Sequence, residues 1–149
     1  MKRALVAVAV LTLGASAVMA QQEIAVQQDK LMRDMARHLY GTMLKTVKGD
    51  LHYNQAAIDA ALAELDKDVA KIATTFAVNP KENVINSDYG ASQKVWQNKA
   101  DFDSKIPVVA QAITELKGKI KDKASLKVAY NTLNDKCNGC HETYRVKLK

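Results

Sequence analysis

The chain has 149 residues, which is enough for one domain and too short for two comfortable ones. Its formal net charge of +6 is too modest to indicate nucleic-acid binding. Aromatic residues make up only 5% of the chain, and no segment alternates polar and apolar residues. These features count against a sheet protein and predict an all-α fold.

The first twenty residues have the order of parts that defines a secretory signal peptide. Two basic residues come first, residues 4–13 form an uninterrupted apolar run, and small residues lead to a cleavage pattern ending at Ala20. The run is too short for a permanent membrane anchor, and no later stretch reaches membrane length. We therefore expect a signal peptide at residues 1–20 and a periplasmic mature domain at residues 21–149. A buried N-terminal helix is the weaker alternative.

Apolar residues with helical spacing then predict four amphipathic helices, at about Glu23 to Val47, Gln55 to Phe76, Ala91 to Lys117 and Ala124 to Lys147. Gly49 should end the first helix and Asn54 should cap the second. Pro107 should kink the third helix or mark a break near Ser104. The longer connection is Val78 to Gly90. None of these helices could bury its apolar face alone, so we expect an antiparallel four-helix bundle.

The only two cysteines lie in the run Cys137-Asn138-Gly139-Cys140-His141. A C-x-x-C-H run is the signature of c-type haem attachment, in which each thiol adds to a vinyl group of the porphyrin. The histidine can then bind the iron through a neutral imidazole nitrogen. On a helix, Cys137, Cys140 and His141 share one face. We therefore expect one covalent haem c in the bundle, with these three residues holding it.

Other uses of the two cysteines explain the run less well. A structural zinc site needs two more Cys or His ligands at suitable spacing. A thioredoxin-like dithiol needs a βαβ context, which the helical pattern lacks. A disulfide would fit an oxidising compartment but leaves His141 without a role.

The ligand on the other side of the iron decides between two functions. An open position favours gas binding, whereas a second protein ligand favours electron transfer. The mature chain offers three methionines and two more histidines: Met32, Met35, Met43, His38 and His52. Methionine is also a common core filler, and the histidines fit surface or capping positions. Helical periodicity does not choose among these residues.

The C-terminal run, continued by Tyr144-Arg145, resembles the class II cytochromes c, which include cytochrome c′. The run Lys30 to Asp34, the run Val47 to Gly49, and the surroundings of Trp96 and Phe102 resemble the low-spin branch called cytochrome c-556 more closely. The resemblance covers essentially the whole mature chain and implies a haem site at the C-terminus of a four-helix bundle.

In cytochrome c-556 a methionine of the first helix binds the iron opposite the histidine, and the resemblance assigns that role to Met32. The high-spin cytochromes c′ have an arginine near the haem one turn earlier, where this chain has Gln28. The match on the first helix needs a one-residue shift near Leu39-Tyr40. Related bundles often dimerise, so the resemblance leaves a homodimer open.

We therefore expect a periplasmic electron-transfer protein with low-spin Met/His haem, which transforms no substrate and is not an enzyme. The alternative is a cytochrome c′-like protein that binds nitric oxide or carbon monoxide at an open sixth site. Eight of the lysines in the last third of the chain suggest a basic surface beside the haem motif that attracts an acidic redox partner. They are Lys117, Lys119, Lys121, Lys123, Lys127, Lys136, Lys147 and Lys149. An ordinary solvated face is the other interpretation.

Overall fold

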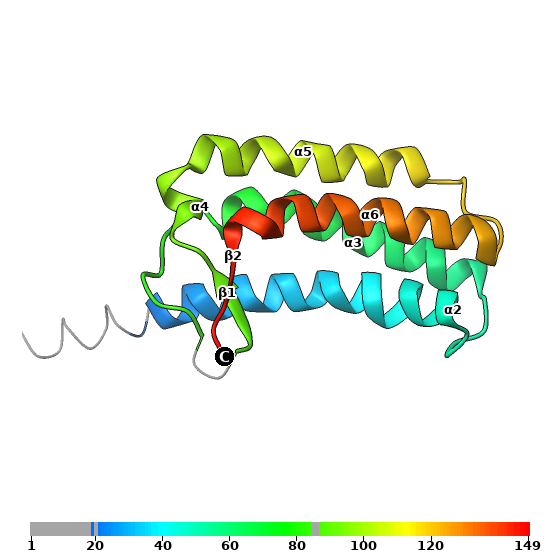
Figure 1. The fold of residues 1–149 in the computed structure, drawn as a ribbon, viewed down its shortest axis with the longest axis horizontal. Helices are drawn as coiled ribbons and strands as arrows, with labels where there is room; N and C mark the ends of the chain where they lie inside the picture. The colour runs from blue at the N-terminus through cyan, green and yellow to red at the C-terminus, as the bar shows by residue number, and fades with distance from the viewer. Residues whose placement is uncertain (1–18, 20, 85–86) are drawn as a thin grey trace, which may run out of the picture.

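Four long helical stretches lie side by side in the computed structural model, which describes residue 19, residues 21–84 and residues 87–149 (Figure 1). The first stretch covers residues 21–48 and contains the π-helix η1 (Arg37–Leu44) followed by α2 (Lys45–Lys48). The remaining elements are α3 (Gln55–Thr75), β1 (Tyr89–Ala91), α4 (Lys94–Gln97), α5 (Lys99–Leu116), α6 (Lys123–Tyr144) and β2 (Arg145–Lys147). The predicted signal peptide lies outside the described residues except for Met19.

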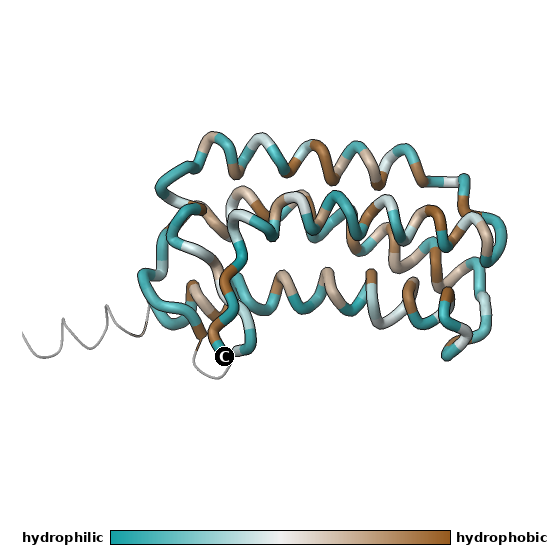
Figure 2. The backbone as a smooth tube through the Cα atoms, in the orientation of Figure 1, coloured by the Kyte–Doolittle hydropathy of each residue, from teal (hydrophilic) through white to brown (hydrophobic). Residues whose placement is uncertain are grey.

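Neighbouring helices close into one bundle, which confirms the predicted fold class. Helix α3 packs against η1 and α5, and α6 packs against α5 and η1. Hydrophobic positions recur along each helix between hydrophilic ones, as Figure 2 shows. No helix in the described residues is both long and apolar enough to cross a bilayer.

Local capping signals define two of the helix ends as the sequence predicts. The Asn54 side chain accepts a hydrogen bond from the backbone N–H of Ala57 at 3.0 Å and begins α3. Gly49 ends α2 with a left-handed φ of 92°, and its N–H donates to the carbonyl of Lys45. Helix α6 begins with a capping box between Asp122 and Ser125.

The third and fourth helices differ from the prediction. Helix α5 continues through Pro107, and the break lies earlier, at Asn98, whose φ of −123° and ψ of 48° are not helical. Proline removes one backbone donor, but Phe102 and Val109 on either side are buried in the core and hold the helix in place. The last helix ends at Tyr144, and residues 145–147 form a strand instead of a final turn.

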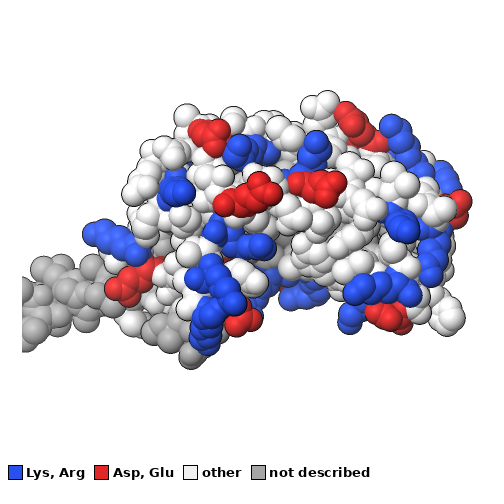
Figure 3. All heavy atoms as spheres, viewed as in Figure 1, with Lys and Arg blue, Asp and Glu red and all other residues white. Residues whose placement is uncertain are grey.

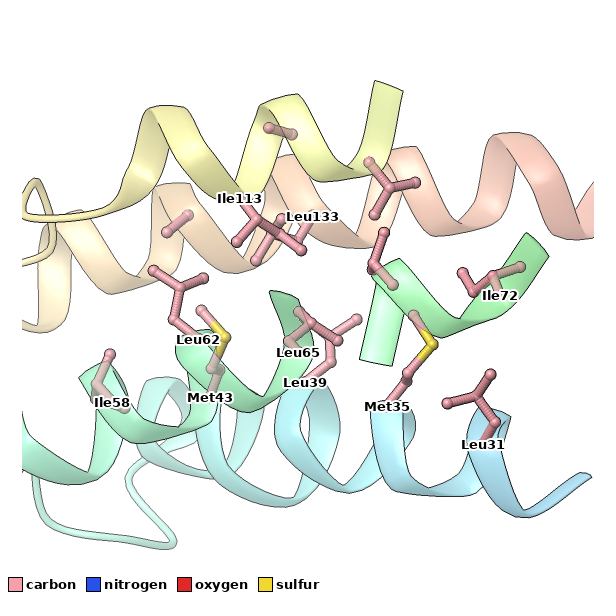
Figure 4. Packing of buried hydrophobic residues seen from close by; sticks show 14 of the residues in the cluster. Leu31, Met35, Leu39, Met43, Ile58, Leu62, Leu65, Ile72, Ile113 and Leu133 are labelled. Atoms are coloured by element: carbon pink, nitrogen blue, oxygen red, sulfur yellow. The ribbon is translucent and has the colours of Figure 1, made fainter. Parts of the chain in front are cut away.

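The core is a continuous apolar layer to which every long helix contributes. Met43, Leu65, Ile113 and Leu133 are at most 1% exposed. Figure 4 shows Leu31, Met35, Leu39 and Met43 projecting from the first helix towards the other three. Such packing of leucine and methionine side chains is what the predicted amphipathic stripes require.

The four-residue spacing of these side chains explains why the first helix contains a π segment. In an α-helix each step of four residues overshoots a full turn by about 40°. Three such steps separate Leu31 from Met43, so a regular helix would rotate one of them out of the core by about 120°. The π turns of η1 contain more residues and absorb this excess. The same segment includes Leu39 and Tyr40, where the family resemblance requires a one-residue shift.

Deleting Gly41 should therefore change the stability by no more than about 1 kcal/mol, because η1 would become a regular helix in which Leu31 and Met43 lie eleven residues apart, close to three full turns. Gly41→Ala is the matched control, since an added Cβ would meet only the Arg37 side chain at an ordinary 3.5 Å. It should stabilise by about 0.5–1 kcal/mol. Urea unfolding followed by far-UV circular dichroism measures both changes. A loss of several kcal/mol in the deletion variant would contradict this account.

Candidate functional site

A cavity of about 430 Å³ lies at the end of the bundle where α6 terminates. Its walls come from residues 25–40 of the first helix, the second half of α3, the first half of α5, the last turns of α6 and the strand pair β1–β2. The volume falls within the range of small-molecule and cofactor pockets, about 300–1,000 Å³. Apolar side chains such as Leu65, Ile72 and Val109 line its interior.

The residues of the cysteine–histidine run face this cavity from α6. Cys137, Cys140 and His141 all line it, at the helical spacing of i, i+3 and i+4. Both cysteines are half-buried free thiols. Burial, followed by the neighbouring Cys140, raises the pKa of Cys137 to about 11. Burial also raises the pKa of Cys140, so both sulfurs carry their protons at neutral pH.

His141 is neutral at physiological pH. Burial lowers the pKa of its imidazole to about 4, and the positive charge of Arg145 contributes in the same direction. A guanidinium nitrogen of Arg145 lies 3.3 Å from Nδ1 of His141. A neutral imidazole retains the lone pair that a metal ion needs.

The three methionines of the first helix have different surroundings. Met32 is partly buried and lines the cavity. Met35 also reaches the cavity but is only 8% exposed and packs within the core cluster. Met43 is fully buried and does not line the cavity. The structure therefore brings Met32 and Met35 to the same cavity as His141 and separates Met43 from it.

The two other histidines do not line the cavity. Nε2 of His38 lies 3.8 Å from the carboxylate of the buried Asp68, on the side of the first helix that faces α3. His52 is exposed in the turn before α3. Within the described residues, no three Cys, His, Asp or Glu side chains converge as a zinc site requires.

Gln28 occupies a buried position on the cavity wall. Its side-chain amide donates hydrogen bonds to the backbone carbonyls of Thr75, at 3.1 Å, and Val78, at 3.0 Å. The residue is 4% exposed. Gln28 thus ties the end of α3 to the first helix and places a neutral group beside the cavity.

Tyr144 connects the end of α6 to α5. Its hydroxyl donates a hydrogen bond to the Asp101 carboxylate, which raises the pKa of Tyr144 to about 12 and lowers that of Asp101. Its ring packs edge-on against Phe102, with ring centroids 5.2 Å apart. Phe102 in turn contacts Phe76 at 5.7 Å. This aromatic cluster closes one side of the cavity.

A family model described as Cytochrome C′ matches residues 22–145, nearly all of the described chain. The chain belongs to the cytochrome c′ family. A protein named cytochrome c-555 from Bradyrhizobium diazoefficiens is 64% identical over 149 residues, which is the full length of both chains. Cytochrome c-556 from Rhodopseudomonas palustris is 38% identical over 148 residues, covering 99% of each chain.

Solved structures of the same family have the same fold. A structural model of oxidised cytochrome c556 from Rhodopseudomonas palustris has a TM-score of 0.72 at 34% identity, covering 86% of this chain and 99% of that one. Cytochrome c′ from the same organism has a TM-score of 0.73 at 28% identity, covering 85% and 98%. The class II cytochrome c resemblance and the four-helix bundle are therefore confirmed.

Membership of the cytochrome c′ family establishes covalently attached haem c as the cofactor. The donor groups on the cavity wall fit such a group. Two protonated thiols and a neutral imidazole lie within two turns of α6, and a thioether lies on the first helix. The apolar remainder of the wall suits a porphyrin face.

The sequence did not predict the strand pair that forms part of the wall. The Asn83 side-chain amide contacts Ala91 of β1 from outside the strand. It accepts from the N–H of Ala91 at 2.9 Å and donates to the Ala91 carbonyl at 3.2 Å. A Cβ on Gly90 would lie 2.3 Å from the Asn83 side chain, so this close approach requires glycine. A three-residue strand is too short to produce an alternating pattern, and the glycine and asparagine signalled only an irregular segment.

The eight lysines from Lys117 to Lys149 do not form one surface beside the haem motif, which corrects the prediction. The link Lys117 to Lys123 lies at the end of the bundle opposite the cavity (Figure 1). The 22 residues of α6 separate the two ends by about 33 Å. Basic side chains therefore occur at both ends, as Figure 3 shows. Arg33, Lys105 and Arg145 line the cavity instead.

Proposed function

We propose that the chain is a periplasmic electron-transfer cytochrome with low-spin haem. Cys137 and Cys140 attach the haem through thioethers, and His141 and Met32 are the axial iron ligands. The observation that supports this proposal is the shared cavity, which His141 lines from α6 and Met32 from the first helix. The haem supplies a one-electron couple when bound.

The surrounding residues suit a carrier. His141 is neutral before ligation, so binding a metal ion does not first require the loss of a proton. Met32 and His141 each belong to a long packed helix, which limits movement of the ligands between oxidation states. Leu65 and Val109, on two other helices, give the cavity an apolar lining. These groups favour electron exchange with little rearrangement and transform no substrate.

Met32→Ala tests this function against its alternative, a gas-binding site that is open or easily opened. One structural relative, a point mutant of cytochrome c′ from Alcaligenes xylosoxidans at 27% identity and a TM-score of 0.66, is described as a nitric oxide complex. We expect the parent protein to be low-spin and indifferent to carbon monoxide. Met32→Ala should give high-spin ferric haem whose ferrous form binds the gas, as optical spectra measure.

Met35→Ala is the matched control on the same helix. Met35 is 8% exposed in the core, so its truncation should cost about 2–5 kcal/mol of stability but leave the low-spin spectrum intact. A low-spin spectrum that survives Met32→Ala and disappears in Met35→Ala would transfer the ligand role to Met35. A parent protein that is high-spin and binds carbon monoxide readily would favour the gas-binding alternative.

Residues 1–20 act as a removable signal peptide in this proposal, and residues 21–149 form the exported domain. Intact-mass measurement of holoprotein from the periplasmic fraction should give a chain that begins at Gln21 plus the mass of one haem. Removal of the signal also lowers the formal charge from +6 to +4, because Lys2 and Arg3 are lost. A product that retains residues 1–20 would contradict export by cleavage.

The redox partner should approach the cavity end of the bundle, where the haem lies. Lys105 lines the cavity, and Lys147 lies on β2, directly opposite Tyr89 in the strand register. The lysines of the link before α6 are about 20 Å or more from Cys137 along the helix axis. The basic groups at the cavity end are therefore the ones that can attract an acidic partner.

Replacing Lys105 and Lys147 together with glutamine should slow oxidation of the ferrous protein by hexacyanoferrate(III) several-fold at low ionic strength, since this anionic oxidant is attracted by positive charge. The matched control replaces Lys119 and Lys121, which carry the same charge at the opposite end. Stopped-flow absorbance measures both rates. Equal slowing by the two pairs would mean that only net charge matters.

A further inference from the structure

The strand pair holds the chain that follows the haem motif in a fixed position. β1 and β2 are antiparallel, with Ala91 opposite Arg145 and Tyr89 opposite Lys147. The N–H of Ser92 donates to the carbonyl of Tyr144 at 2.9 Å, and the N–H of Leu148 donates to the carbonyl of Asp88 at 2.9 Å. The segment after α6 is thus hydrogen-bonded on both sides of Arg145.

Side-chain contacts anchor β1 on its other edge. The Asn83 amide pairs with the backbone of Ala91, as described above. The Ser87 hydroxyl oxygen lies 2.9 Å from a carboxylate oxygen of Asp29 on the first helix and 2.9 Å from the carbonyl oxygen of Tyr89. β1 is therefore fixed to the bundle independently of β2.

Arg145 lies between Tyr89 and His141. Arg145 and Tyr89 are on the same face of the strand pair, as diagonal neighbours. The guanidinium carbon is 4.7 Å from the centroid of the Tyr89 ring, within the range of a cation–π contact. On the other side, a guanidinium nitrogen is 3.3 Å from Nδ1 of His141. In the described part of the chain, no carboxylate forms an ion pair with Arg145.

A positive charge in this position acts on the iron through the histidine. An imidazole that binds iron through Nε2 carries its proton on Nδ1, so the guanidinium cannot donate a hydrogen bond there. Metal-binding histidines usually donate this proton to an acceptor, which makes the ring a stronger ligand. A nearby cation has the opposite effect: it disfavours the ferric state relative to the ferrous state, which has one less positive charge.

We propose that Tyr89 is a positioning residue that holds the Arg145 guanidinium beside His141 and thereby raises the reduction potential of the haem. Without the Tyr89 ring, the long Arg145 side chain would extend into water, where its charge is screened. The proposal rests on the part of the proposed function that assigns His141 to the iron. It does not depend on the identity of the sixth ligand.

A double-mutant cycle with Tyr89→Leu and Arg145→Gln tests the proposal, with the midpoint potential of the holoprotein as the readout. Arg145→Gln should lower the potential. Tyr89→Leu should lower it when Arg145 is present and change it little in the Arg145→Gln background. Tyr89→Phe is the matched control, because it retains the ring and should keep the parent potential. Tyr89 is 48% exposed, so neither Tyr89→Leu nor Tyr89→Phe opens a core cavity.

Several results would overturn the proposal. One is an unchanged potential in Arg145→Gln, and another is an equal effect of Tyr89→Leu in both backgrounds, which would indicate greater exposure of the haem to solvent. Loss of haem from Tyr89→Leu would show that the ring supports the fold and not the charge. Failure of the proposed function is distinguishable, since the parent protein would then lack covalent haem, or the His141→Ala variant would keep a low-spin spectrum.

Discussion

The last turns of α6 continue the core of the bundle and also present Cys137, Cys140 and His141 to the cavity. Leu126, Ala129 and Leu133 form the buried stripe of this helix. Continued by three- and four-residue steps, the stripe reaches Cys137, Cys140 and Tyr144. The cysteines therefore occupy core positions, and the cavity lies where the core of an ordinary bundle would be filled with side chains. In the proposed function the haem completes the core at this end, so its attachment and the folding of the bundle would depend on the same helix register.

The features that the sequence predicts well depend on neighbouring residues. The Asn54 cap and the left-handed Gly49 follow from the conformational preferences of single residues, and the stripes follow from helical spacing. The face shared by Cys137, Cys140 and His141 follows from the same spacing. These groups meet within two turns of one helix, so the sequence could predict their meeting without knowledge of the tertiary fold.

The features that it does not predict depend on contacts between distant residues. β1 exists because residues 145–147 pair with residues 89–91, and three residues on each side leave no periodic signal. The break expected near Pro107 lies at Asn98 instead, and α5 runs through the proline between the buried Phe102 and Val109. The π segment is intermediate: four-residue steps from Leu31 to Met43 are visible in the sequence, but only packing shows that all of them face the core.

Charge demonstrates the difference between distance along the chain and distance in space. Lys123 precedes the haem motif on the same helix. In a straight helix the two lie about 20 Å apart, well beyond the Debye length of about 8 Å in physiological salt. Arg33 is more than 100 residues from the motif in sequence and lines the same cavity. The electrostatic potential in the cavity therefore depends mainly on residues brought together by the fold. Arg145 lies 3.3 Å from Nδ1 of His141 because two short strands hold it there.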